Sequence, residues 1–255
     1  MSGLAGKNII STCAINKAQK LDTLLKHKKA VSHIFPLIDV VAADDNKSEI
    51  KSLLTKLDDY KWLLFTSSNG VKYFFYWLNK FNIEVDLLKS KNIAAIGDAT
   101  DHEVKKHGFK THYISKQKHS KYFAEELKFF LTTNNKALLI KGNLAPSSFK
   151  TRLQEFCMVS DLIVYNTQMP EYINNNILQK IESNNYDLLL FLSPSAFSNF
   201  KHILAPTIDI KKIRCASIGD TTSDYLKNNG VEPVLKATEP NIEVLIDDIE
   251  KYYLT

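Results

Sequence analysis

The sequence predicts an α/β protein built from two open parallel sheets with helices packed on them. Short apolar segments such as "WLLFT" (62–66) alternate along the chain with segments whose apolar residues recur at helical spacing. In addition, "IAAIGDATDHEVKKHGFK" (93–110) aligns without a gap with "CASIGDTTSDYLKNNGVE" (215–232). Strands that alternate with helices form right-handed βαβ units in a parallel sheet, and the repeated plan requires two such sheets.

The N-terminal region supplies a first strand and a first helix. Residues 8–15, "NIISTCAI", have the apolar character of a strand, and a helix is expected around residues 18–28. The segment "IFPLIDVVAA" (34–43) is a further extended segment. Pro36 lacks a backbone N–H, so this segment is expected at a sheet edge.

A strand, a polar turn and a helix then follow one another. The buried strand at 62–66 precedes a helix whose core face carries Val71, Phe74, Phe75 and Leu78. Any of Ser67, Ser68 and Asn69 can accept a hydrogen bond from the free N–H groups at the start of this helix.

The arrangement recurs at "LLLFLSPSAFSNF" (188–200). Here Ser193 is the expected cap, and Pro194 occupies the first helical position, where its missing N–H costs nothing. Helix capping is therefore a sufficient structural role for both serines, Ser67 and Ser193.

The repeated segment carries a Gly-Asp turn after a strand in each half. The aligned pairs are Gly97 with Gly219, Asp98 with Asp220, Thr100 with Thr222, and Gly108 with Gly230. Each half is expected to form a helix capped near its threonine and ended by a glycine in left-handed conformation. A further strand (111–115 or 233–237) and a last helix (121–131 or 241–253) complete each half.

The order of the elements indicates that the first domain is discontinuous. The second half of the repeat has no strand of its own before "DLLLFLS", whereas the N-terminus supplies an unpaired strand and helix. We therefore expect a first flavodoxin-like domain from residues 1–35 and 170–255, and a second from residues 43–161. Linker strands at 36–42 and 162–169 are expected to pair as a two-stranded β ribbon.

Composition limits the class of protein. With 255 residues, 44% of them hydrophobic, the chain can bury two cores, and no apolar run is long enough to cross a membrane. The net charge of +5 comes almost wholly from lysine, since Arg152 and Arg214 are the only arginines. This composition disfavours a nucleic-acid-binding protein. The N-terminus lacks the features of a secretory signal, so the cytoplasm is the expected location.

Cysteine and histidine positions predict neither a disulfide framework nor a metal site. The three cysteines are far apart and odd in number, which predicts buried free thiols (Cys13, Cys157 and Cys215). Three histidines recur every five residues and share no helix or strand face, so surface positions are expected (His102, His107 and His112).

Polar turns follow the strands of both predicted sheets. In an open parallel sheet, ligands bind at the carboxyl ends of the strands, where helix N-termini present backbone N–H groups. The turns there are "FTSSNG", "IGDAT", "KGNLAPSS", "FLSPSA" and "IGDTT". Two such turn sets are expected to face one another across a cleft, and their many uncharged donors suit a ligand that carries numerous carboxylates.

An ordered set of motifs resembles the uroporphyrinogen-III synthase family. The motifs are "FTSSNGV" (65–71), "IGDAT" (96–100), "KGN" (141–143), "VYNT" (164–167), "LSPSA" (192–196) and "IGDTT" (218–222), the last followed by "TEPNIEVLIDDI". The set spans nearly the whole chain, and its specificity lies in the order of the motifs. The resemblance implies the two-domain fold described above and a monomer without cofactor or metal.

The resemblance also implies an activity. A member of this family is a hydro-lyase that closes linear hydroxymethylbilane to uroporphyrinogen III in haem biosynthesis. Loss of the hydroxyl group gives an azafulvene, ring D attacks to form a spiro intermediate, and this fragments and recloses with ring D inverted. The enzyme's task is to position a flexible substrate and to assist the departing hydroxide with one acid.

The site residues follow from the same resemblance. Tyr165 matches the family tyrosine on an interdomain strand and is the expected acid, with packing in the ribbon as its alternative role. The turns are expected to bind the substrate's carboxylates through Thr66, Ser67, Ser68, Asn69, Gly97, Thr100, Lys141, Gly142, Asn143, Ser193, Pro194, Ser195, Gly219, Thr221 and Thr222. For each hydroxyl taken alone, capping remains an equal alternative.

Two departures from the family pattern affect the residue roles inferred from the resemblance. Many relatives place a basic residue and a proline just after the first strand, where this chain has "STCAINK" (11–17) and Lys17 is a poor substitute. The turn at Thr66, Ser67 and Ser68 also lacks the proline found in its counterpart at 194.

Three other functions fit parts of the sequence. A non-enzymatic two-domain hinge protein that binds an anionic small molecule would share the fold and the turns. A nucleotide enzyme is disfavoured because the chain has neither GxGxxG nor GxxxxGK[ST]. An interaction module would leave the polar turns without a role.

Overall fold

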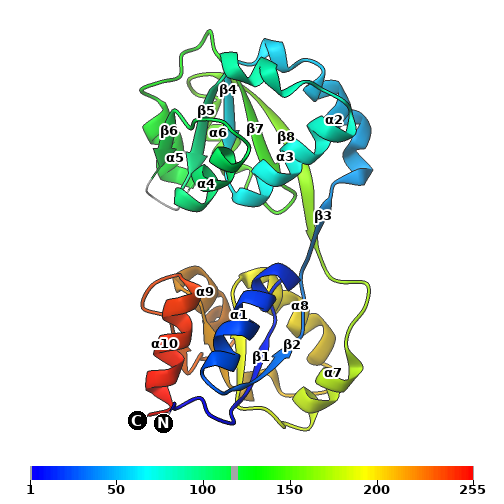
Figure 1. Ribbon diagram of the computed structural model, residues 1–255, viewed down its shortest axis with the longest axis vertical. Helices are drawn as coiled ribbons and strands as arrows, with labels where there is room; N and C mark the ends of the chain where they lie inside the picture. The colour runs from blue at the N-terminus through cyan, green and yellow to red at the C-terminus, as the bar shows by residue number, and fades with distance from the viewer. Residues whose placement is uncertain (1, 116–119, 255) are drawn as a thin grey trace. The chain divides into compact units, whose positions relative to one another are not determined.

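The computed structural model describes residues 2–115 and 120–254, which form two compact units. One unit contains the chain up to Asp39 and from Gln168 onward, and the other contains Val40–Thr167. Each unit is an α/β layer structure in which helices cover both faces of one sheet (Figure 1). The predicted α/β class with parallel sheets is therefore confirmed.

The first unit holds a five-stranded sheet in the order β11-β10-β9-β1-β2. Every strand pairing in it is parallel. Its strands are β1 (Asn8–Ser11), β2 (Val31–Ile34), β9 (Leu188–Phe191), β10 (Cys215–Ser217) and β11 (Leu235–Lys236). Its α-helices are α1 (Ile15–His27), α7 (Asn175–Glu182), α8 (Pro194–Leu204), α9 (Asp220–Asn228) and α10 (Ile242–Tyr252).

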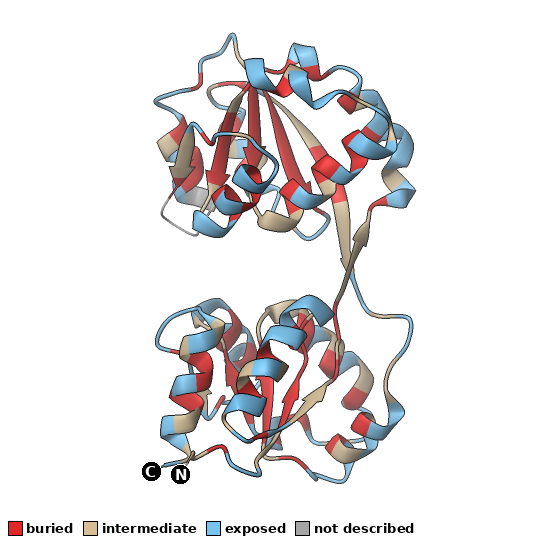
Figure 2. Ribbon diagram, in the orientation of Figure 1, coloured by how far each residue is buried: buried red, intermediate tan, exposed pale blue. Residues whose placement is uncertain are grey.

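Two apolar layers hold this sheet. On one face, α1 and α10 pack against strand residues such as Ile9 and Leu190. An aromatic cluster belongs to α8, where Phe197 and Phe200 both meet Phe191 edge to face. The central strands are buried along their length, as near-continuous apolar strands of a parallel sheet must be (Figure 2).

The second unit holds a six-stranded sheet in the order β3-β8-β7-β4-β5-β6. Its strands are β3 (Asp39–Ala42), β4 (Trp62–Phe65), β5 (Asn92–Ile96), β6 (Tyr113–Ser115), β7 (Lys136–Gly142) and β8 (Met158–Gln168). Its α-helices are α2 (Lys47–Leu54), α3 (Ser68–Lys80), α4 (Asp98–Lys106), α5 (Ser120–Leu127) and α6 (Ser148–Leu153). One core joins the sheet to α2, α3 and α4, and another joins it to α5 and α6.

Three element boundaries differ from the sequence-based expectation. The first strand ends at Ser11 instead of residue 15, because α1 already begins at Ile15. The predicted helix at 121–131 ends at Leu127, although Leu131 stays buried. The expected single segment at 34–43 is two strands that belong to different sheets, β2 and β3.

Pro36 follows β2, the edge strand of the first sheet. The amides of Phe35 and Leu37 donate to the carbonyl oxygens of Ser11 and Thr12. Since alternate residues of an extended segment direct their N–H groups to opposite sides, the position of Pro36 faces away from β1, where a missing N–H breaks no bond. Beyond Pro36, the chain leaves the first sheet and enters the second at β3.

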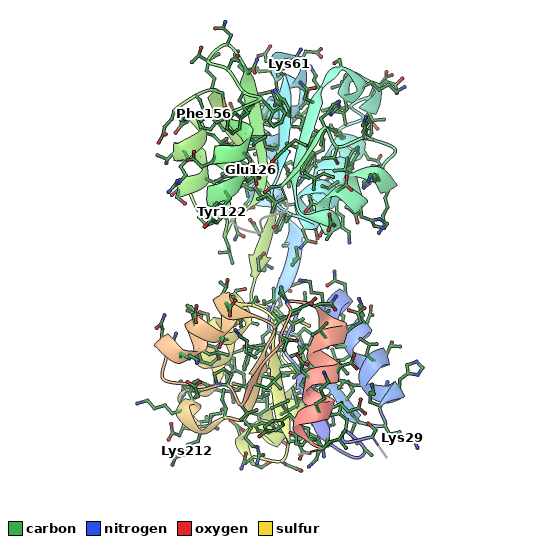
Figure 3. All side chains as sticks on the ribbon, turned by 90° about the vertical axis from the view of Figure 1, so that its left-hand side faces the viewer. Lys29, Lys61, Tyr122, Glu126, Phe156 and Lys212 are labelled. Atoms are coloured by element: carbon green, nitrogen blue, oxygen red, sulfur yellow. The ribbon has the colours of Figure 1, made fainter. Side chains whose placement is uncertain are left out.

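Most of the lysine charge lies on solvated surface. Lys29, Lys61 and Lys212 are exposed and extend away from their sheets (Figure 3). Several other lysines form surface ion pairs, which individually contribute little to stability.

The carboxylate of Asp248 ties α10 to the preceding turn and predicts a pH-dependent contribution to stability. It accepts hydrogen bonds from the amide and the hydroxyl of Thr238, each at 2.9 Å. The bond from this amide lowers the pKa of Asp248, against the opposing effect of burial. Because the pKa is lower in the folded state, this contribution is complete above the unfolded value of about 3.9 and is lost as the pH falls through the folded value.

We expect Asp248→Asn to lower the free energy of unfolding at pH 7 by about 2 kcal/mol, the range for a hydrogen bond to a charged group. Urea unfolding of both proteins at pH 7 and near pH 3 should show this difference shrinking at the lower pH. The matched control is Asp247→Asn, because Asp247 is 59% exposed and its ion pair, with Lys28, lies on the surface. An Asp248→Asn difference that stays constant between the two pH values would contradict the assignment.

Candidate functional site

The turn after β4 begins the candidate site of the second unit. Ser67 is the N-cap of α3, and its Oγ accepts a hydrogen bond from the amide of Gly70 at 3.0 Å. The same Oγ lies 3.1 Å from the hydroxyl oxygen of Tyr165. Ser67 therefore caps a helix and also contacts the expected acid.

Tyr165 lies near the end of β8 in the second unit. Its ring stacks on that of Tyr73 from α3, with 5.7 Å between the ring centroids and 26° between the planes. Its hydroxyl group reaches Ser67, which is 98 residues away in sequence. Tyr165 is partly exposed. The phenol thus lies at the carboxyl end of the sheet, where ligands of this fold class bind.

A β-bulge places Tyr165 there. Lys141 of β7 pairs with Ile163, but the next residue, Gly142, pairs with Tyr165. The ladder thus advances by one residue on β7 and by two on β8, with Val164 as the extra residue. The Val164 carbonyl accepts a hydrogen bond from the indole of Trp77 at 2.8 Å, so the irregular backbone is not left unsatisfied. Bulges commonly re-aim a side chain next to a functional site.

The "KGN" segment contacts the strand that carries Tyr165. The ammonium of Lys141 is buried and lies 2.7 Å from a carboxylate oxygen of Asp161. The Asn143 side chain accepts a hydrogen bond from the Thr167 amide at 2.8 Å and donates to the Thr167 carbonyl at 3.3 Å. Both predicted ligand side chains are therefore engaged with β8, and the Lys141 charge is not offered to solvent.

In the first unit, the turn after β9 matches its predicted counterpart. Ser193 caps α8 by accepting a hydrogen bond from the Ala196 amide at 3.3 Å, and Pro194 occupies the first turn of the helix. The hydroxyl oxygens of Ser193 and Ser195 lie 3.1 Å apart. Both serines are partly exposed, so each can still contact a ligand.

The two Gly-Asp turns lead into helices, but their threonines do not cap them. The N-cap residues are Gly97 for α4 and Gly219 for α9, and neither helix has a side-chain cap. Thr100 and Thr222 lie inside the first turn and are only 3% and 4% exposed. The capping role considered for Thr100 and Thr222 is wrong, because Gly97 and Gly219 occupy the N-cap positions and both threonines are buried within the first turn.

The remaining predicted residues lie on accessible parts of the turns. Thr66, Ser68 and Asn69 are partly exposed around the start of α3, and Thr221 is exposed in the first turn of α9. Thr66 also points its hydroxyl toward the Ile140 carbonyl at 3.5 Å. Each unit therefore gathers several predicted hydroxyl and amide groups at the carboxyl edge of its own sheet.

The cysteines are buried free thiols, as predicted. Burial raises the pKa of Cys13 and of Cys157 to about 11, and that of Cys215 to about 12. The thiolate form needed for nucleophilic chemistry is therefore scarce at neutral pH. Within residues 2–115 and 120–254, no group of three or more potential ligand side chains could hold a metal ion. No described helix has the length and apolar character needed to cross a membrane.

Three contributors to the site were not anticipated from the sequence. Tyr73 supplies the ring under Tyr165, Trp77 holds the bulge, and Asp161 pairs with Lys141. Tyr73 and Trp77 lie on the amphipathic helix that was predicted, but helical periodicity does not identify a partner on a distant strand. Asp161 offered only one signal, a charged residue in an otherwise β-prone segment.

Comparison with known proteins shows the family of this chain. Residues 19–247 match the family model "Uroporphyrinogen-III synthase HemD". The porphyrin biosynthesis protein HemD of Ruminiclostridium josui is 22% identical over 247 residues, covering 96% of this chain and 48% of that protein. The chain thus spans about half the length of that relative.

Solved structures show the same fold. The chain is similar to a crystal structure of uroporphyrinogen III synthase from Thermus thermophilus, with a TM-score of 0.68, 15% identity, and coverage of 97% of this chain and 98% of that one. It is also similar to the enzyme from Helicobacter pylori, with a TM-score of 0.64, 18% identity, and coverage of 96% and 99%. Because the family model covers most of its length, the chain belongs to the uroporphyrinogen-III synthase family.

Proposed function

We propose that this chain is a uroporphyrinogen-III synthase, a hydro-lyase that cyclises hydroxymethylbilane with inversion of ring D. The observation that carries the proposal is the contact between the Tyr165 phenol and Ser67 at the carboxyl edge of a parallel sheet, in a chain of this family. A phenol is a good hydrogen-bond donor and can transfer a proton to a departing hydroxide. We further propose that the chain acts in the cytoplasm as a monomer; the monomeric state rests on the family resemblance alone.

Each unit offers candidate substrate contacts on its own turns. The carboxylates of the substrate accept hydrogen bonds from backbone amides and hydroxyl groups of Thr66, Ser67, Ser68, Asn69, Gly97, Ser193, Ser195, Gly219 and Thr221. Pro194 has no N–H and contributes only the geometry of its turn. Thr100 and Thr222 support the turns from the core. Lys141, Gly142 and Asn143 support β8.

The proposed reaction requires few reactive groups from the protein. The pyrrole nitrogens of the substrate supply the electrons that expel hydroxide, and Tyr165 donates a proton to the leaving oxygen. Ring D then attacks through its substituted carbon, and the spiro intermediate fragments and recloses at the free α carbon of ring D. The proton released from this carbon restores the Tyr165 phenol. Holding the bilane so that this closure is nearer than the uninverted one is positioning catalysis. The turns supply this positioning and Tyr165 supplies the acid.

The direct test is a coupled assay in which hydroxymethylbilane is generated in the presence of the purified chain. We expect the type III isomer of uroporphyrinogen, whereas the spontaneous reaction gives the uninverted type I isomer. Binding of the bilane without a change in the isomer ratio would favour a non-enzymatic protein that binds an anionic small molecule.

Affinity should be spread over many weak contacts. We expect Ser193→Ala to weaken binding of uroporphyrinogen III by about 0.5–1.5 kcal/mol, the net value of one hydrogen bond. Ser198→Ala is the matched control, since Ser198 is an exposed serine of the same helix, α8, and is not among the proposed ligands. It should leave the dissociation constant unchanged. Equal loss of affinity in both variants, measured by equilibrium titration, would contradict the assignment of Ser193 as a ligand.

A further inference from the structure

We infer that Gly142 is a positioning residue for Tyr165, an inference that rests on the proposed function. A Cβ atom built on Gly142 would lie 2.4 Å from Cζ, 2.5 Å from Cε2 and 2.8 Å from the hydroxyl oxygen of Tyr165. Real Cβ atoms essentially never lie closer than 3.0 Å to such a neighbouring atom, so an added Cβ would force a shift. The phenol therefore occupies the space that any other residue at position 142 would need for its own side chain.

The bulge in β8 makes this close approach necessary. Because Gly142 pairs with Tyr165, and not with Val164, the ring lies directly over the Gly142 backbone. The Val164 carbonyl is held by the Trp77 indole and by the amide of Ala43, at 2.8 Å and 3.2 Å. The Asn143 amide also donates to the Tyr165 carbonyl at 3.2 Å. The backbone around the ring is thus fixed on both sides.

Two further contacts define where the phenol points. The Tyr73 ring stacks on the Tyr165 ring, and Ser67 contacts its hydroxyl group. Ser67 cannot follow a displaced hydroxyl freely, because its oxygen also caps α3. A methyl group at 142 would therefore push the ring out of its place and separate its hydroxyl from Ser67.

Displacement of the phenol is expected to affect kcat much more than KM. A displaced phenol still lies in the site, but its proton no longer points at the same place, and misplacement of a reacting group by about 1 Å can cost about 100-fold in rate. Gly142→Ala should lower kcat by at least tenfold and leave KM within about twofold, because the substrate's carboxylates bind at the turns.

The experiment is a double-mutant cycle on the purified full chain. We expect Gly142→Ala to lower kcat in the wild-type background and to cause no further loss in the Tyr165→Phe background, where the hydroxyl is already absent. The control for a general packing defect is Gly3→Ala in the first unit. A Cβ atom at Gly3 would lie 2.7 Å from the carbonyl oxygen of Glu250, which belongs to the same unit. Gly3→Ala should destabilise the fold and leave kcat of the folded fraction unchanged.

A second measurement does not depend on activity. The coupling between Ser67→Ala and Tyr165→Phe in unfolding free energy should be present with glycine at 142 and absent with alanine. If Gly142→Ala does not fold, a variant of Tyr73 tests the same placement of the phenol. Tyr73→Leu removes the stacked ring and should lower kcat with little change in KM. Tyr73→Phe keeps the ring and should have the kcat of the wild type.

The outcomes distinguish failure of the proposed function from failure of the positioning role of Gly142. A wild-type chain that makes no type III isomer overturns the proposed function, while the Ser67–Tyr165 coupling still tests the role of Gly142. An active wild type with full kcat in Gly142→Ala overturns the positioning role. So does an equal loss of kcat in both backgrounds, which would mean that Gly142 acts on the substrate directly.

Discussion

Replacement of Tyr165 by phenylalanine is expected to lower kcat about 100-fold, the lower range for loss of a general acid. The ring should stay in place, since its stacking on Tyr73 and its space over Gly142 do not depend on the hydroxyl group. Affinity for uroporphyrinogen III should change little, because an interaction made mainly in the transition state affects rate more than ground-state binding.

The isomer ratio of the product from Tyr165→Phe distinguishes proton donation by Tyr165 from positioning of the substrate. If the turns position the substrate and Tyr165 only donates a proton, the slow product of Tyr165→Phe should still be mainly the type III isomer. Tyr225→Phe is a matched control, because Tyr225 is a partly exposed tyrosine of α9 that packs against Phe197. An unchanged kcat in Tyr165→Phe would reduce Tyr165 to a packing residue.

Removal of the Asp161 carboxylate is expected to have the largest effect on stability. Asp161→Ala leaves the Lys141 ammonium, whose side chain is only 7% exposed, without its anionic partner. Breaking a buried ion pair from one side costs about 3–5 kcal/mol, and the partial exposure of Asp161 favours the lower end. Lys141→Met should cost less, because Asp161 keeps Lys150 at 3.7 Å and is 24% exposed.

Chemical unfolding of these variants tests whether Asp161→Ala lowers stability more than Lys141→Met does. The control is Asp58→Ala, since Lys91 is equally buried but also donates to the Asp58 carbonyl, and the Asp58 carboxylate is 88% exposed. The double variant Lys141→Met with Asp161→Leu should recover most of the stability, as apolar replacement of a buried pair often does. A cost for Asp161→Ala no greater than that for Asp58→Ala would show that Lys141 finds water or another partner.

The order of strands and helices could be predicted because it depends on local patterns. The apolar segment at 62–65 and the periodic residues after it are each short-range signals, and the structure has a strand and a helix there. The capping serines were equally local, since Ser67 and Ser193 bond to amides only three residues away. For Thr100 and Thr222 the local rule failed, because burial of the helix face decided their orientation.

The sequence by itself determined the α/β class, the repeated plan and the turn residues, since propensity, periodicity and capping act over a few residues. Only the tertiary structure decided what those residues contact. Tyr165 meets Ser67 across 98 positions, and Lys141 meets Asp161 across 20. The bulge that sets Tyr165 over Gly142 depends on pairing between β7 and β8 and on a bond from Trp77 of α3. Such contacts depend on strand register and on packing between distant segments, which no local pattern in the chain encodes.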